Sequence, residues 1–174
     1  LMLGGIKEYL IITKQSDLHQ YKLILGNGHQ WGIDIKYKIQ KKPGGLPEAF
    51  IIGESFINNE PVCLNLGDHI FFGSKVISSL KKNIINFNSN VIFSVKSNSP
   101  QNYGVLNFDK HNKVNKIEEK PKTPTSKNIL CGLYLFDKNV VNYSKKLKKS
   151  SRNELEITDL INIYLKKNNL NVEV

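Results

Sequence analysis

The chain has 174 residues, of which 40% are hydrophobic, and a formal net charge of +10. Its length suits one domain with a sizeable core, and no apolar run approaches the roughly 20 residues that a membrane-spanning helix needs. The charge invites nucleic-acid binding, but Arg152 is the only arginine, and base and phosphate recognition depend heavily on arginine. We therefore expect a solvated lysine-rich surface, with neither nucleic acid nor a membrane as partner.

Short apolar runs alternate with helical stretches in the first half of the chain. The predicted strands are 9–13, 33–39, 61–67 and 91–96, and the predicted helices are 17–25, 45–58 and 74–85. Strands that alternate with helices predict right-handed crossovers and a mostly parallel sheet. In such sheets, ligands bind beyond the carboxyl ends of the strands.

The second half changes rhythm. Two short strands joined by a polar turn are predicted within 103–121, and another strand at 129–137 precedes a lysine-rich helix. Residues 153–167 start polar and become an amphipathic helix. The sequence begins within an apparent helix tail and ends at 170–174 in the middle of a strand. We therefore expect an internal piece of a longer protein, a single partial domain over 1–174.

The stretch QKKPGGLPEAF, residues 40–50, joins a strand to a helix through a glycine-rich turn. Glycines allow a ligand to approach the backbone, and the amide of Gln40 can pair with the edge of a nucleobase. An ordinary strand-to-helix turn is the alternative.

The stretch LNLGDHIFFG, residues 64–73, ends an apolar run with an acid. Asp68 at a strand end is a candidate Mg²⁺ ligand, because Mg²⁺ is held by one or two carboxylates with water and phosphate. His69 beside it faces the same ligand only if the strand end does not alternate. A turn without chemistry is the alternative for both residues.

The stretch IEEKPKTP, residues 117–124, places two acids before a lysine. A glutamate can accept sugar hydroxyls and a lysine can neutralise a phosphate, although a charged surface loop explains the same pattern. Cys63 and Cys131 each lie in an apolar run, which favours buried thiols in a reducing cytoplasm without excluding a disulfide. The sequence contains no P-loop, no Cys/His metal cluster and no serine-centred elbow.

Taken in order, these stretches, together with YGVLNFD, GLYLFD and ELEITDLINIYL, resemble the bacterial sugar-nucleotide pyrophosphorylases, and within them the glucose-1-phosphate thymidylyltransferases. The resemblance covers almost the whole chain. It implies an incomplete α/β fold, a Rossmann-like three-layer α/β/α arrangement with a mixed, mainly parallel sheet. It also implies a cytoplasmic enzyme that is a homo-oligomer, commonly a tetramer, and that uses Mg²⁺.

The reaction implied is the transfer of a nucleotidyl group from dTTP to glucose 1-phosphate, giving dTDP-glucose and pyrophosphate, the first step toward dTDP-rhamnose and related sugars. For the nucleotide, the resemblance implies that Gln40 and Gly45 contact the thymine base. It implies that Asp68 binds Mg²⁺ and that Asp68 and Lys120 act in catalysis.

For the sugar phosphate, the resemblance implies that Gly104 and Glu119 hold the glucose and that Lys120 holds its phosphate. The remaining residues implied around the sugar are His69, Leu130, Cys131, Arg152 and Glu154.

This chain departs from the family pattern in several places. The family has Asn at His69, Ala-Gln at Pro47 and Glu48, and Val-Thr at Leu130 and Cys131. The family's GGxGTRL loop, its downstream lysine and its WLDTGT-like segment have no counterpart in these residues. We therefore expect the 174 residues alone to be inactive and to expose an apolar sheet edge. A pyrophosphorylase for UTP or another nucleotide or sugar phosphate, and a non-catalytic sugar-nucleotide-binding subunit, are the alternatives.

Overall fold

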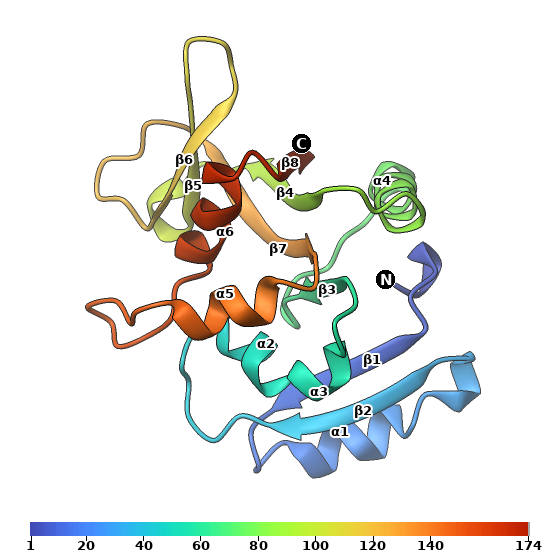
Figure 1. Ribbon diagram of the computed structural model, residues 1–174. Coiled ribbons are helices and arrows are strands. Elements are labelled where there is room, and N and C mark those ends of the chain that lie inside the picture. The colour runs from blue at the N-terminus through green and yellow to red at the C-terminus, as the bar shows by residue number, and fades with distance from the viewer. Residues whose placement is uncertain (174) are drawn as a thin grey trace.

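The computed structural model describes residues 1–173, and it contains a six-stranded sheet and a separate two-stranded sheet (Figure 1). The strands are β1 (Glu8–Thr13), β2 (Asp34–Ile39), β3 (Val62–Asn65), β4 (Asn90–Lys96), β5 (Gly104–Phe108), β6 (Val114–Glu119), β7 (Asn128–Phe136) and β8 (Leu170–Glu173). In the larger sheet the order is β6-β5-β7-β4-β8, and β3 pairs with β7 outside this path. The last predicted strand is confirmed as β8, while Val174 lies outside the described residues.

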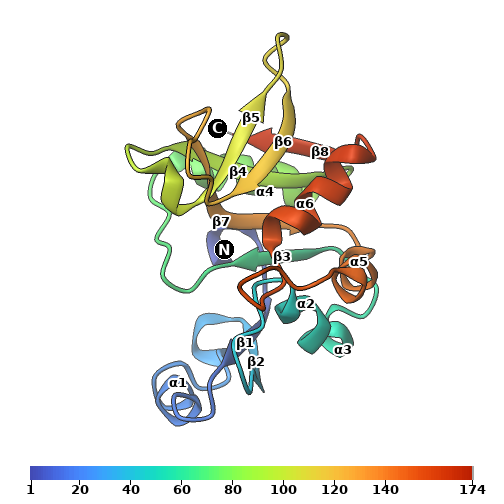
Figure 2. The ribbon, with the colours of Figure 1, turned by 90° about the vertical axis from the view of Figure 1, so that its left-hand side faces the viewer.

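Helices cover both faces of the larger sheet, as Figures 1 and 2 show. The helices are α1 (Leu18–Leu25), α2 (Glu48–Ile52), α3 (Glu54–Ile57), α4 (Ser74–Ile85), α5 (Val140–Lys146) and α6 (Ile157–Lys166). Helices α2, α3, α5 and α6 pack in one hydrophobic cluster, and α4 packs through Leu80 in a second. The predicted three layers, helices on either side of a sheet, are therefore confirmed.

Strand β7 forms the centre of this core. Eight of its nine residues are buried, and from Leu130 to Phe136 the side chains alternate between the two hydrophobic clusters, Gly132 having none. Tyr134 and Phe136 point into the cluster of α5 and α6, whereas Leu133 and Leu135 point into that of α4. This alternation follows from the two-residue period of a strand.

The expectation of a mainly parallel sheet is wrong in its pairing. Strands β1 and β2 pair in parallel, as do β4 and β8, but the other four pairings are antiparallel. Strands β3 and β4 run in the same direction, as their connection through α4 predicted, but β7 lies antiparallel to both. A strand from the second half of the chain therefore separates the two strands that the crossover joins.

Two other predicted elements differ in detail. The helix expected at 45–58 is divided into α2 and α3 at Gly53, which ends one helix and begins the next. The helix expected within 153–167 begins at Ile157, because the polar residues before it form a turn and bends. In α6 the buried residues Ile157, Leu160, Ile161 and Tyr164 follow helical spacing and cover the sheet.

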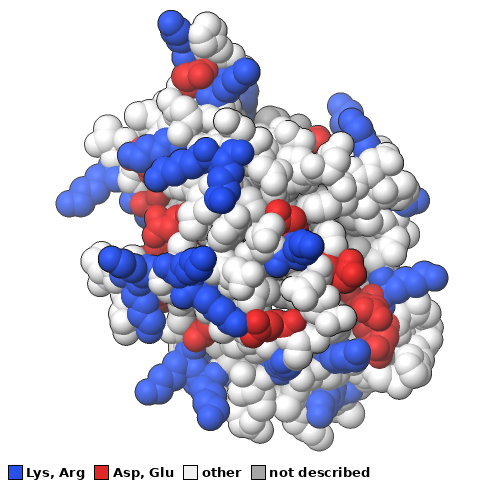
Figure 3. Space-filling model, viewed as in Figure 1, with Lys and Arg blue, Asp and Glu red and all other residues white. Residues whose placement is uncertain are grey.

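A solvated lysine-rich surface was expected from the sequence. On the face shown in Figure 3, Lys and Arg side chains are spread over the molecule with Asp and Glu side chains among them. Cys63 and Cys131 are free thiols, and burial raises the pKa of Cys131 to about 11. Within residues 1–173, none of the helices has the length and hydropathy of a membrane span.

Candidate functional site

A cavity of about 280 Å³ lined by several charged side chains lies where β5, β6 and β7 meet the turn before α2 and the loop before α6. Eight of the residues proposed from the sequence line it: Gly45, His69, Gly104, Glu119, Lys120, Leu130, Arg152 and Glu154. They come from six separate parts of the chain. The fold thus gathers most of the predicted sugar site into one hollow.

Glu119 and Lys120 enter the cavity at the end of β6. Glu119 lies opposite Gly104 in the register of β5 and β6, and the Lys120 amide donates to the Tyr103 carbonyl over 3.0 Å. Burial raises the pKa of the Glu119 carboxyl, and the negative charge of Glu156 raises it further, while Arg152 opposes both effects. A half-buried carboxylate beside a lysine suits a ligand that offers hydroxyl donors and one anionic group.

Gly104 has a packing role that explains its lack of a side chain. A methyl group there would lie 2.8 Å from Leu130 Cδ1 and 2.9 Å from Thr158 Cγ2. The glycine therefore lets β5 approach β7 and α6 closely, which also keeps Leu130 at the cavity wall.

Arg152 connects the carboxylates of the cavity. Its Nη2 lies 2.6 Å from Glu156 Oε2, 3.3 Å from Glu119 Oε1 and 3.9 Å from Glu154 Oε2, and its Nε donates to Glu156 Oε1 over 3.1 Å. This two-point pairing with Glu156 is the fork geometry that a guanidinium forms with a carboxylate. The Glu156 carboxylate therefore holds the Arg152 guanidinium at the cavity.

Glu156 lines the cavity, and the sequence interpretation did not single it out. It is only 7% exposed, and it also accepts a 2.6 Å hydrogen bond from the Ser150 hydroxyl. Burial opposes its ionisation, but the hydrogen bonds from Arg152 and Ser150 outweigh burial and lower its pKa. The signal in the sequence was its spacing, two residues from Glu154 in ELEIT, directly before the apolar face of α6.

The glycine turn and the loop before α6 are joined by their backbones. The Leu155 amide donates to the Gly44 carbonyl over 2.8 Å, and Gly45 has a φ of +94°. A side chain at Gly45 would collide with the Leu155 backbone. Glycine at this position is thus required for the turn to reach the cavity.

Gly132 is a second residue that the sequence interpretation did not single out. It has a φ of +74° within β7, beside the register shift between β7 and β4. A methyl group there would lie 3.0 Å from Leu66 Cδ1 and 3.1 Å from His69 Nδ1. A glycine inside an apolar strand was the available signal, since it often marks a bulge or a close approach.

Asp68 and His69 occupy different positions. His69 lines the cavity, whereas the Asp68 side chain is 84% exposed and does not line it. The two side chains lie 2.8 Å apart, and this hydrogen bond lowers the pKa of Asp68. Within residues 1–173, no group of three or more His, Cys, Asp or Glu side chains is arranged to hold a metal ion. Asp68 is therefore a single exposed carboxylate, and it lies in the turn that follows β3 instead of at the end of the strand.

Cys131 requires a correction. It was expected to line the sugar pocket with Leu130, but its side chain is buried with Leu80 and Leu133 on the opposite face of β7. Successive residues of a strand point to opposite faces, so only one residue of this pair can reach the cavity.

Gln40 also lies outside the wall of this cavity. It follows β2, where its backbone amide donates to the Thr13 carbonyl over 2.9 Å, and its side-chain amide donates to Glu48. Gln40 and Gly45 are thus on the same turn, but only Gly45 reaches the cavity.

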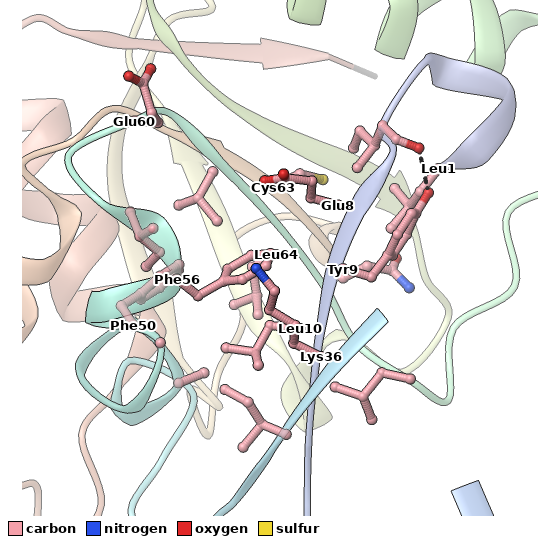
Figure 4. A pocket seen from close by; sticks show the side chains of 18 of the residues that line it. Leu1, Glu8, Tyr9, Leu10, Lys36, Phe50, Phe56, Glu60, Cys63 and Leu64 are labelled. Carbon is pink, nitrogen blue, oxygen red and sulfur yellow. Dashed lines mark hydrogen bonds between the residues drawn. The ribbon is translucent and has the colours of Figure 1, made fainter. Parts of the chain in front are cut away.

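A larger cavity of about 850 Å³ lies between the two sheets, and none of the proposed site residues lines it (Figure 4). Leu10 of β1 faces Leu64 of β3 across it, and Phe50 and Phe56 come from α2 and α3. Apolar side chains make up most of its wall, and Glu8, Lys36 and Glu60 are the charged residues that line it.

Comparison with known proteins identifies the family. The model of the nucleotidyl transferase family matches residues 1–174. A glucose-1-phosphate thymidylyltransferase of Neisseria meningitidis is 42% identical over the whole chain, and one of Mycolicibacterium smegmatis is 40% identical; the chain spans 60% of each.

Solved structures agree with this result. A Bacillus anthracis structure described as a glucose-1-phosphate thymidylyltransferase in complex with a sucrose has a TM-score of 0.84 at 34% identity, covering 94% of this chain and 66% of that one. A UDP-glucose pyrophosphorylase complexed with UDP-glucose shares the fold, with a TM-score of 0.75 at 20% identity over 95% of this chain and 72% of the other. The predicted Rossmann-like fold and the resemblance drawn from the motifs are confirmed: the chain belongs to the nucleotidyl transferase family.

Proposed function

We propose that this chain forms part of a glucose-1-phosphate thymidylyltransferase, which joins dTTP and glucose 1-phosphate into dTDP-glucose and pyrophosphate. The observation that carries the proposal is the cavity in which Gly104, Glu119, Lys120, Arg152 and Glu154 converge. Family membership and the names of the most similar relatives support it.

In this reaction an oxygen of the sugar phosphate attacks the α-phosphorus of the nucleotide. A new phosphorus–oxygen bond forms as the bond to the β-phosphate oxygen breaks, and its electron pair leaves with pyrophosphate. The protein contributes mainly by positioning the two reactants and balancing their charge. Glu119 accepts hydrogen bonds from the sugar hydroxyls, Lys120 neutralises the sugar phosphate, and Arg152 keeps the carboxylates of the cavity in place.

In this chain Asp68 would hold Mg²⁺, because its exposed carboxylate can serve as one ligand beside phosphate oxygens and water. When bound, the ion would spread the negative charge that develops on the phosphates. On the nucleotide side, we assign the thymine contact to Gln40 and to the turn at Gly45. The product belongs at the start of routes to dTDP-rhamnose and related sugars, and we place the enzyme in the cytoplasm, as a homo-oligomer.

The test is calorimetric titration of dTDP-glucose into the 174-residue chain, with Mg²⁺ present and UDP-glucose as comparison. We expect tighter binding of the thymidine compound, and a loss of about tenfold or more in Glu119→Gln, because the charged, half-buried acceptor of sugar hydroxyls becomes a neutral amide with one acceptor oxygen. Glu118→Gln is the matched control: its carboxylate pairs with Lys116 at 2.7 Å and with Asn107 at 2.6 Å, outside the cavity.

Other outcomes separate the alternatives. Equal binding of dTDP-glucose and UDP-glucose would point to a sibling enzyme with another nucleotide. A folded Glu119→Gln variant that binds as well as the parent chain would contradict the assigned sugar site. We expect binding without turnover from these residues, because they contain no counterpart of the GGxGTRL loop. Turnover by this chain would contradict that expectation.

A further inference from the structure

The amide of Gln40 is tied to a neighbour that the family pattern does not contain. Its Nε2 donates to Oε2 of Glu48, the first residue of α2. The backbone of Gln40 is also held, since its amide donates to the Thr13 carbonyl over 2.9 Å. Hydrogen bonds thus hold both the backbone and the side-chain amide of Gln40. Gln40 and Glu48 are only half-buried, so a ligand can reach them.

The turn between the two residues makes room for this contact. A methyl group at Gly44 would lie 2.5 Å from Glu48 Oε2 and 2.6 Å from its Cδ. The Glu48 backbone amide donates to the Gly45 carbonyl over 3.2 Å, which sets the start of the helix beneath Gln40. The absence of a side chain at Gly44 therefore leaves room for the Glu48 carboxylate.

The negative charge of Glu48 fixes the orientation of the Gln40 side-chain amide. An ionised carboxylate only accepts hydrogen bonds, so the NH₂ group of Gln40 must face Glu48 and its carbonyl oxygen must face away. This orientation follows from the hydrogen-bonding chemistry of the pair. Gln40 consequently presents a hydrogen-bond acceptor, beside its second N–H, to a ligand at the turn.

We propose that Glu48 is a specificity-determining residue: by fixing the Gln40 amide, it selects a pyrimidine with an N–H donor on its pairing edge and rejects cytosine. The inference rests on the proposed function, in which Gln40 contacts the base. Thymine and uracil carry a ring N–H between two carbonyls. That N–H donates to the Gln40 oxygen, and one carbonyl accepts from the remaining N–H of the amide.

Cytosine carries an unprotonated ring nitrogen at the same place. That nitrogen and the Gln40 oxygen are both acceptors, so the pair cannot form in this orientation. Turning the amide over would place its oxygen against the Glu48 carboxylate and lose a charge-assisted hydrogen bond. An amide at position 48 would remove this barrier, because it can donate or accept and so allows both orientations of Gln40.

The experiment measures the ratio of dTDP to dCDP affinity by calorimetry on the whole 174-residue chain. We expect the parent chain to prefer dTDP and Glu48→Gln to lose about tenfold of that preference, the scale of one charge-assisted hydrogen bond. Glu54→Gln is the control: it makes the same change on α3, where Glu54 pairs with Lys145 over 2.5 Å, and should leave the ratio unchanged. Thermal unfolding of each variant verifies that it is folded.

A folded Glu48→Gln variant with the parent's dTDP to dCDP ratio would overturn the inference and leave the proposed function standing. Unchanged dTDP binding in Gln40→Ala would overturn both the inference and the assigned base contact. The same holds if neither nucleotide binds the folded parent chain. The sugar site is judged separately, by dTDP-glucose binding in Glu119→Gln against Glu118→Gln.

Discussion

The two cavities of this protein differ in volume and in the charged residues that line them, and the smaller one contains the predicted site residues. The larger, of about 850 Å³, lies between β1 and β3 and is mainly apolar, whereas the smaller, of about 280 Å³, gathers three glutamates, a lysine and the only arginine. A polar ligand needs a few convergent charged groups; the smaller cavity joins Arg152 to three carboxylates, whereas Glu8, Lys36 and Glu60 are the charged residues among the many apolar ones that line the larger cavity. Matched substitutions in the two cavities, and the titration of Glu119 in the smaller one, test this difference.

The largest effect is expected from glycine substitutions. Gly45→Ala should cost about 2 kcal/mol or more of unfolding free energy and abolish dTDP-glucose binding, because its φ of +94° and the Leu155 backbone leave no room for a side chain. Gly67→Ala, at the wall of the larger cavity, has nothing within 4 Å of the added methyl group and should change stability by less than about 1 kcal/mol. Urea denaturation measures both, and equal costs would contradict the assignment of Gly45.

A smaller effect is expected from removing one carboxylate charge in each cavity. Glu156→Gln should cost about 1–2 kcal/mol and weaken dTDP-glucose binding, because Arg152 loses its two-point partner. Glu60→Gln, at an exposed position of the larger cavity, should stay within about 0.5 kcal/mol and bind as the parent does. Equal effects of the two substitutions on stability and on dTDP-glucose binding would contradict the role assigned to the Glu156 carboxylate.

The smallest effect is expected in how the free energy of unfolding and the affinity for dTDP-glucose change with pH. Because the pKa of Glu119 is raised above its ordinary value of 4.5 in the folded chain, its contribution to stability is present below that value and lost as pH rises through the raised pKa. Glu119→Gln should therefore gain stability relative to the parent as pH rises through this window. Binding runs the other way: the parent should lose affinity for dTDP-glucose as acid protonates Glu119. Unfolding and titration measured from pH 4 to 7 check both signs, and parallel stability profiles would contradict the assignment.

Local patterns in the sequence predicted most elements and their types. The amphipathic residues of α6 and the alternation of strands and helices through α4 are confirmed, because apolar periodicity depends on neighbours along the chain. The family motifs also placed eight residues that meet in the smaller cavity. The motif match did not distinguish Leu130 from Cys131, since which face of β7 points to the cavity depends on how that strand packs.

By itself, then, the sequence determined most of the helices and strands, the family to which the chain belongs, and four charged residues that line the smaller cavity: Glu119, Lys120, Arg152 and Glu154. Only the tertiary structure decided that β7 separates β3 from β4, that Glu156 holds Arg152, and that Glu48 orients Gln40. Periodicity and motif spacing are properties of a short stretch of chain. Strand pairing and the choice of a hydrogen-bond partner depend on segments brought together across many residues, so they are settled only when the whole sheet packs.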